Sequence, residues 1–304
     1  MSQADFMIED PSFRRCVKLS GRVEQLFADC YWAEGPVYFA AHRCVVWSDI
    51  PNNRMLKYDE LNRVVGTFRS PSEYANGNTL DRAGRLLTCE QGTRRVTRTE
   101  HDGSITVIAD RYGEGRFNSP NDIVVTADGS IWFTDPSYGI DSDYEGMRAP
   151  SELDGCHVYR VSGDTGEIEQ VLDDFDRPNG LAFAPDERHL YVVDSGGTHR
   201  PDGPRHIRKF SVSEQGKLGG GDVFATCDCG FFDGIRIDEE GRLWAAAGDG
   251  VRCYESSGNL IGRINIPEPV SNLTFGGPKR NRLYITATSS LYTVLIAANG
   301  AQRP

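Results

Sequence analysis

The sequence lacks the features of a membrane, secreted or nucleic-acid-binding protein. In its 304 residues no apolar run reaches the length of a transmembrane helix, and the first ten residues contain no basic segment followed by an apolar one. The net charge is −11 and the 33 Lys and Arg residues are scattered, so nucleic acid and anionic membranes are not expected partners. We therefore expect a cytoplasmic enzyme or binding protein.

Motifs of several enzyme classes are also missing. The eight cysteines have no C-x-x-C spacing, so we expect no cysteine metal site and mostly free thiols. Val193-Asp-Ser-Gly-Gly lacks the first glycine of a hydrolase nucleophile elbow, and Gly113-Glu-Gly-Arg-Phe-Asn lacks the third glycine of a dinucleotide fingerprint. No apolar pattern at helical spacing persists beyond a turn or two, which indicates an all-β fold.

What the chain does contain is a repeat. Short strand-like cores recur about 40 to 60 residues apart, at Val45–Asp49, Leu86–Glu90, Ile131–Asp135, Leu190–Asp194, Leu243–Ala247 and Leu283–Thr286. Most follow another strand-like run and a turn such as Ala127-Asp-Gly-Ser or Glu239-Glu-Gly-Arg, which is typical of a hairpin. One or two further strands follow in each unit. Four antiparallel strands repeated six times predict a six-bladed β-propeller.

The repeat predicts a single domain that spans residues 1–304, with a short amino-terminal extension at about residues 1–20. Two β-sandwich domains would leave the six-fold phase unexplained, and a linear solenoid would need a shorter, stricter repeat. We expect the strand near Val23–Phe27 to close the ring by completing the blade formed by Leu291–Ile296.

An acidic or amide side chain stands about ten residues upstream of each core. These residues are Glu34, Asn76, Asn121, Asn179, Asp233 and Asn272. If every hairpin begins at the same end of the ring, all six face one another around the mouth of the channel. A donor set that consists only of oxygen atoms suits Ca²⁺ best, with Mg²⁺ or Mn²⁺ as alternatives, whereas Zn²⁺ would recruit nitrogen or sulfur. The alternative is that Asn and Asp open these strands only because they form local turns.

Two long loops, residues 136–155 and 195–206, are expected to project from the same face. They carry the polar side chains of Tyr138, Tyr144, His199, Arg200 and His206. Long loops on the face of a cation site are typical of pocket walls or a lid.

Motifs over nearly the whole chain resemble one family. They are Glu34-Gly-Pro, Asn118-Ser-Pro-Asn-Asp-Ile-Val-Val, Ile131-Trp-Phe-Thr-Asp-Pro-Ser-Tyr-Gly, Arg177-Pro-Asn-Gly-Leu-Ala-Phe-Ala-Pro-Asp, Phe232-Asp-Gly-Ile-Arg-Ile-Asp and Asn272-Leu-Thr-Phe-Gly-Gly. The chain resembles the SMP-30/gluconolactonase/luciferin-regenerating-enzyme family, and within it the bacterial gluconolactonases. The resemblance implies a divalent cation at the top of the channel, held by Glu34, Asn179 and Asp233, with Asn121 as a ligand or a substrate contact. Asn76, Tyr138 and Asn272 are further candidates for substrate binding. Asn76 and Asn272 could instead orient the ligands or only cap turns.

The function expected from this resemblance is a Ca²⁺-dependent lactonase that hydrolyses a small sugar lactone, D-glucono-1,5-lactone. Asp233 is the candidate general base and Glu34 the alternative. Two other functions stay open at this point. One is a metal-dependent phosphotriesterase-type hydrolase, because a metal polarises P=O as it polarises C=O. The other is a non-catalytic propeller that binds a partner and uses its cation only structurally.

Overall fold

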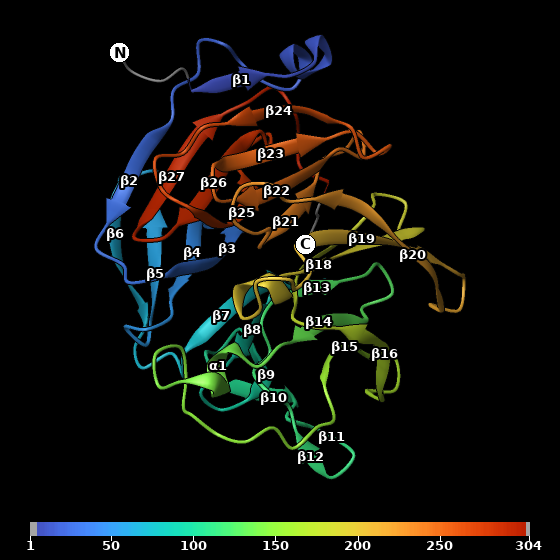
Figure 1. Ribbon diagram of the computed structural model, residues 1–304. Helices are drawn as coiled ribbons and strands as arrows, with labels where there is room; N and C mark the ends of the chain where they lie inside the picture. Colours follow the sequence, from blue (N-terminus) through green and yellow to red (C-terminus); the bar gives the residue numbers. More distant parts are fainter. Residues whose placement is uncertain (1–4, 302–304) are drawn as a thin grey trace.

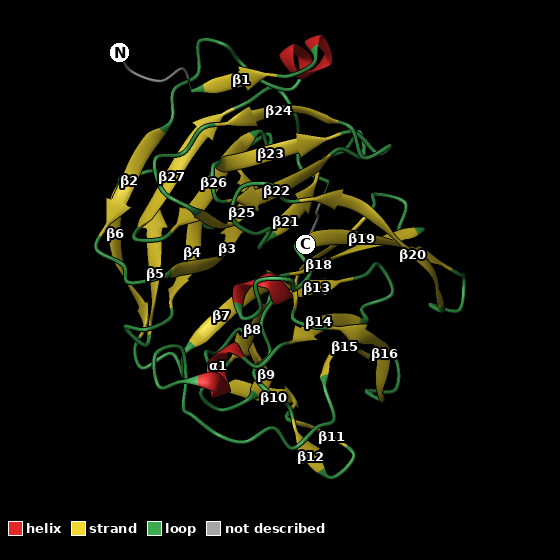
Figure 2. Cartoon of the chain, in the orientation of Figure 1, coloured by secondary structure: helices red, strands yellow, loops and turns green. Residues whose placement is uncertain are grey.

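The computed structural model describes residues 5–301, whose backbone forms a ring of six antiparallel sheets (Figures 1 and 2). The predicted all-β, six-bladed propeller is confirmed. Helical structure in this range is confined to three short segments, Pro11–Arg15, α1 (Tyr138–Asp141) and Gly196–Thr198. No helix among the described residues is long and apolar enough to cross a membrane.

The blades follow one another along the chain. Blade 1 consists of β3 (Ala33–Phe39), β4 (Cys44–Asp49), β5 (Arg54–Asp59) and β6 (Val64–Arg69). Blade 2 consists of β7 (Ala75–Leu80), β8 (Leu86–Glu90), β9 (Arg95–Thr99) and β10 (Ile105–Ala109). A small hairpin of β11 (Arg111–Tyr112) and β12 (Gly115–Arg116) precedes blade 3, which consists of β13 (Ile123–Val125), β14 (Ile131–Asp135), β15 (Cys156–Val161) and β16 (Ile168–Phe175).

The second half of the ring repeats the pattern. Blade 4 consists of β17 (Pro178–Phe183), β18 (His189–Asp194), β19 (His206–Val212) and β20 (Leu218–Thr226). Blade 5 consists of β21 (Ile235–Ile237), β22 (Leu243–Ala247), β23 (Gly250–Tyr254) and β24 (Leu260–Ile264), with β1 (Phe6–Ile8) as a fifth strand. Blade 6 consists of β25 (Val270–Gly276), β26 (Arg282–Ala287), β27 (Ser290–Leu295) and β2 (Glu24–Ala28).

The ring closes as predicted. Strand β2, from the amino-terminal part of the chain, pairs antiparallel with β27, with Glu24 opposite Thr293 and Ala28 opposite Ser290. The first strands of the blades, β3, β7, β13, β17, β21 and β25, contact one another in that circular order, and β25 returns to β3. They therefore line the central channel, and residues at their beginnings share one end of it.

The hydrophobic core is divided among the blade-to-blade contacts. Six clusters of buried side chains fill the six interfaces between neighbouring blades. In β4, Val45 and Trp47 pack against blade 6, while Val46 packs against blade 2. Alternate side chains of a strand point to opposite faces of its sheet. Both faces of this strand are buried, which explains why the strand cores stand out as continuous apolar runs.

The hairpin turns lie at the Asp-Gly and Glu-Gly sequences from which they were predicted. In the turn after β13, Asp128 accepts hydrogen bonds from the backbone N of Ser130 at 2.9 Å and the hydroxyl of Thr126 at 2.6 Å. Gly129 follows with φ of +83°, a conformation that glycine adopts without steric cost. Asp238 and Gly241 form the equivalent turn after β21, where Asp238 accepts from the backbone N of Glu240 and of Arg242 at 3.0 Å each.

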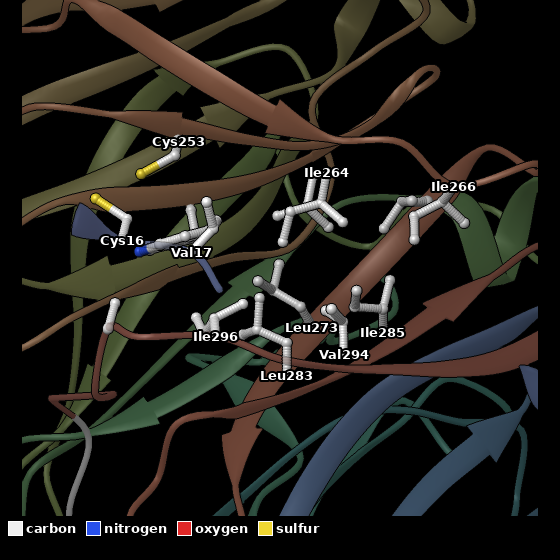
Figure 3. Packing of buried hydrophobic residues seen from close by; sticks show 14 of the residues in the cluster. Cys16, Val17, Cys253, Ile264, Ile266, Leu273, Leu283, Ile285, Val294 and Ile296 are labelled. Carbon is white, nitrogen blue, oxygen red and sulfur yellow. The ribbon is translucent and has the colours of Figure 1, made fainter. Parts of the chain in front are cut away.

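The segment predicted as an extension packs on the ring. Strand β1 pairs with β24, and Phe13 is fully buried against Trp244. A Cβ on Gly262 would lie 2.1 Å from the Phe13 ring, so the aromatic side chain needs glycine there. Cys16 and Val17 join the cluster between blades 5 and 6 (Figure 3). All eight cysteines are free, as expected for most of them. That the whole chain, residues 1–304, is one domain stays a prediction, because residues 1–4 and 302–304 lie outside the described range.

Candidate active site

The predicted oxygen-bearing residues gather at one end of the channel. Each lies at the beginning of the first strand of its blade, or one or two residues before it. Five of the six line a cavity of about 410 Å³, and these are Glu34, Asn76, Asn121, Asn179 and Asp233. Tyr138, predicted as a substrate contact, lines the same cavity. The phase of the repeat therefore predicted a real convergence of side chains from five blades.

Asn272 is the exception among the six. It does not line the cavity; instead its Nδ2 donates to Glu34 Oε2 at 2.9 Å, and its Oδ1 accepts from the backbone N of Leu273 at 2.8 Å. This arrangement makes Asn272 a positioning residue for the Glu34 carboxylate. The substrate contact predicted for it stays a prediction that this geometry does not favour.

A glycine follows four of the site residues, and packing between blades explains it. A Cβ on Gly35 would lie 2.0 Å from the Asn76 carbonyl oxygen, and one on Gly180 would lie 2.2 Å from that of Asp233. Gly77 and Gly234 have equally close neighbours on the next blade, at 2.3 and 2.1 Å. The dipeptide of an oxygen-bearing residue and glycine thus marks four of the site residues, because each glycine lies against the next blade, either against its backbone or, for Gly234, against the Asn272 side chain.

The ionised forms of Glu34 and Asp233, the two carboxylates of the candidate cation site, are electrostatically destabilised. Burial, followed by the nearby charge of Asp122, raises the pKa of Glu34 above its ordinary value, and the hydrogen bond from Asn272 opposes this shift. Burial, followed by the charge of Glu34, raises the pKa of Asp233. Both shifts have the physical cause expected for like charges in a poorly solvated site.

Among the described residues, no Lys, Arg or His side chain lines the cavity to offset these charges. The described residues that line it include three carboxylates, those of Glu34, Asp233 and Glu145, and no Lys, Arg or His. Deeper in the channel the buried pair Asp122 and Arg236, with Oδ2 and Nη1 3.3 Å apart, provides one internal ion pair. Sequence reasoning missed this pair; its signal is that Asp122 stands where four other blades have glycine.

The donor set fits a hard divalent cation. Glu34 and Asp233 supply charge, and Asn121 and Asn179 supply amide oxygens. Asn179 Nδ2 donates to Ser195 Oγ at 3.4 Å, which leaves its Oδ1 for a cation. Within residues 5–301 no cluster of three or more His, Cys, Asp or Glu side chains is arranged to hold a metal. The candidate site instead mixes two carboxylates with two carboxamides, a set that suits Ca²⁺ or Mg²⁺.

The two long loops meet over the mouth. The Tyr138 hydroxyl lies 3.1 Å from Thr198 Oγ1, and Arg177 contacts the face of the Tyr138 ring at 5.2 Å. Asp141 pairs with Arg177 at 2.9 Å and with His199 at 3.3 Å. The loops therefore support each other. Of the polar loop residues named from the sequence, only Tyr138 lines the cavity, and Tyr144, His199, Arg200 and His206 do not.

Sequence reasoning also missed the apolar wall of the cavity. It is formed by residues shortly upstream of the site oxygens of blades 1, 5 and 6, namely Trp32, Phe231, Phe232, Pro269 and Val270. Their shared position ahead of the repeated oxygens is a signal that could have identified them. Glu145, from the loop of residues 136–155, was missed because an insertion has no counterpart in the other repeats.

Comparison with known proteins identifies the family. Residues 32–289 match the family model described as SMP-30/Gluconolactonase/LRE-like region. The chain belongs to this family. It is 30% identical to a gluconolactonase of Zymomonas mobilis, over 93% of this chain and 84% of that protein. It is 27% identical to the pentonolactonase XacC of Haloferax volcanii, over 84% and 81% of the two chains.

A solved structure supports the same assignment. A gluconolactonase of Xanthomonas campestris superposes with a TM-score of 0.90 at 35% identity, covering 96% of each chain. The resemblance predicted from the sequence motifs is confirmed.

Proposed function

We propose that this protein is a divalent-cation-dependent lactonase that hydrolyses D-glucono-1,5-lactone to gluconate, with Ca²⁺ as its cation. That it is a hydrolase acting on a cyclic ester follows from its family and from relatives that are a gluconolactonase and a pentonolactonase. The observation that carries the proposal is the convergence of Glu34, Asn121, Asn179 and Asp233 on one cavity, whose lining within residues 5–301 has no cationic side chain.

Glu34, Asn179 and Asp233, with Asn121 as a fourth donor, would hold the cation. When bound, a divalent cation offers Lewis-acid polarisation of a carbonyl and stabilises the negative charge that develops on its oxygen. The two carboxylates would balance the charge of a divalent cation, and the neutral amides would add donor oxygens without further negative charge.

The residues of the chain then have separate tasks. Asn272 and the backbone N of Gly35 both donate to Glu34 Oε2 and fix its carboxylate. Asp233 is the proposed general base: it accepts a proton from the water that attacks the lactone carbon. As the bond between that carbon and the ring oxygen breaks, the proton returns to the ring oxygen and the hydroxy acid leaves. Burial and the neighbouring charge of Glu34 raise the pKa of Asp233 in the cation-free protein, whereas a bound cation would lower it, so Asp233 would also act by orienting the water. Glu34 stays the alternative.

The walls of the cavity have two further roles. The aromatic and aliphatic side chains around the mouth exclude bulk water from one side of the cavity, which strengthens electrostatic interactions within it. Asn76, Asn121 and Tyr138 supply polar groups on the other side for a hydroxylated substrate. We expect no nucleic acid or membrane partner and a cytoplasmic location; both stay predictions from the sequence.

The test is hydrolysis of D-glucono-1,5-lactone, followed by proton release, after EDTA treatment and again after Ca²⁺, Mg²⁺ or Mn²⁺ is restored. The phosphotriester paraoxon is assayed in parallel. Metal-restored lactone hydrolysis well above the spontaneous rate supports the proposal and ranks the cations. Turnover of paraoxon alone would favour the phosphotriesterase alternative. Turnover of neither would favour a non-catalytic binding module.

A further inference from the structure

Glu145 is a carboxylate in the cavity that neither the cation site nor the proposed chemistry uses. It lies in the loop between β14 and β15 and lines the cavity together with Tyr138. Among the described residues no hydrogen bond or ion pair to its side chain is found, and its charged neighbours, Asp141 and Asp233, are both acidic. A carboxylate surrounded in this way lacks the donors that a partly buried charge requires.

The loop fixes Glu145 in this position. Asp141 is paired with Arg177, and the backbone N of Ala149 donates to the Ile140 carbonyl at 3.1 Å. A Cβ on Gly146 would lie 2.2 Å from the Gly139 carbonyl oxygen, so the loop folds tightly back on itself next to Glu145. The carboxylate is therefore part of a folded wall of the cavity.

The cavity has two chemically different sides. Blade 3 contributes Asn121, Tyr138 and Glu145, which are polar. Blades 5, 6 and 1 contribute the apolar wall, and blades 1 and 5 also contribute Glu34 and Asp233 of the proposed cation site. A six-membered sugar lactone has the same asymmetry, with C–H groups on its ring faces and hydroxyl donors on its edge. Carboxylates accept strong hydrogen bonds from such donors, and a hydroxyl donor is what Glu145 lacks.

We propose that Glu145 determines substrate specificity by accepting hydrogen bonds from the ring hydroxyls of a sugar lactone. The proposal rests on the proposed function for the substrate, and it separates two tasks: Glu34 and Asp233 act at the carbonyl, and Glu145 selects a hydroxylated ring. It follows that removing the negative charge of Glu145 weakens binding of hydroxylated ligands and leaves ligands without hydroxyls unaffected.

The experiment compares wild type, Glu145→Gln and a control, Glu114→Gln, which removes the same charge from an exposed turn between β11 and β12. Each is assayed with D-glucono-1,5-lactone and with δ-valerolactone, the same ring without hydroxyls. For Glu145→Gln we expect KM for the sugar lactone to rise about tenfold, as for a lost charge-assisted hydrogen bond. We expect three quantities to stay within twofold of wild type: kcat for the sugar lactone, kcat and KM for δ-valerolactone, and the Ca²⁺ affinity measured by calorimetry. The control should match wild type.

A second readout does not depend on turnover. Calorimetry with 1,5-anhydro-D-glucitol, which keeps the ring and hydroxyls but has no carbonyl, should show about tenfold weaker binding to Glu145→Gln. This holds even if wild type hydrolyses neither lactone, so a failure of the proposed function is distinguished from a failure of this inference. The inference is overturned if the variant binds the polyol as wild type does, if wild type does not bind it, if both lactones lose kcat equally, or if Ca²⁺ affinity falls. Circular dichroism and the melting temperature verify that the variant is folded.

Discussion

The two ends of the central channel are lined in opposite ways. A cavity of about 520 Å³ lies at the end where the first strands of blades 3, 4 and 5 finish, and its charged residues are two arginines and two glutamates. They are Arg82, Arg236, Glu187 and Glu239. Arg82 pairs with Glu187 at 3.6 Å, and Glu239 pairs with Arg280 at 2.6 Å. At the other end, the cavity that holds Glu34 and Asp233 is smaller, and the charged side chains among the described residues that line it are all acidic.

The difference favours the acidic end of the channel as the functional end. Paired charges at a channel end are satisfied by the fold itself and need no ligand. Uncompensated, buried carboxylates cost stability unless something binds them, and proteins retain such groups at functional sites.

The largest effect is expected when a mutation at the acidic end of the channel is compared with one at the opposite end. Asp233→Asn removes the proposed base and a cation ligand while keeping the shape of the side chain, so kcat/KM for D-glucono-1,5-lactone should fall by about a thousandfold or more. Glu187→Gln makes the equivalent change at the other end and should leave kcat/KM within twofold. Wild-type activity in Asp233→Asn would eliminate this residue as base and ligand.

The second prediction concerns the packing that brings the site residues together. Gly180→Ala places a Cβ against the backbone carbonyl of Asp233, which cannot move away as a flexible side chain can. We expect a loss of about 1–3 kcal/mol in the free energy of unfolding, with lower activity because Asn179 and Asp233 shift. Gly66→Ala, where a Cβ meets no atom within 4 Å, is the control for denaturant unfolding. Equal stability of the two variants would contradict the packing explanation.

The third prediction is a pH dependence of the cation-free protein. The pKa of Glu34 is raised in the folded state, so folding favours its protonated form. Its contribution to stability is present below its ordinary pKa of 4.5 and is lost as the pH rises through the higher folded-state pKa. In EDTA the melting temperature should therefore fall with rising pH more steeply in wild type than in Glu34→Gln. Identical slopes for the two proteins would show that Glu34 is not destabilised.

The smallest effect is expected in the loops. Asp141→Asn weakens the pairs with Arg177 and His199 that support the loop carrying Tyr138. We expect KM to rise a few-fold with kcat unchanged, because an ion pair that is partly exposed contributes about 1 kcal/mol or less. Asp143→Asn in the same loop is the control, because Asp143 forms no ion pair with any described residue. A loss of kcat would place the loop in the chemistry instead.

The sequence predicts those parts of the molecule that repeat. Because the blades are equivalent, the six strand cores, the closure by β2 and the shared end of Glu34, Asn76, Asn121, Asn179 and Asp233 all follow from one periodicity. The parts that break the repeat were not predictable in this way. The position of Glu145 depends on contacts within a single insertion, and the role of Asn272 depends on which neighbour its amide reaches. Asp122 departs from the glycine pattern, but only the structure shows its pair with Arg236.

The central prediction is that the acidic end of the channel holds a catalytic divalent cation. The most direct test is a Ca²⁺ titration of EDTA-treated protein in which cation binding, by calorimetry, and the initial rate of D-glucono-1,5-lactone hydrolysis are measured on the same sample. We predict that rate and occupancy rise together to saturation in wild type, and that both are lost in Glu34→Gln. Hydrolysis that persists in EDTA and does not respond to Ca²⁺, Mg²⁺ or Mn²⁺ would contradict the account.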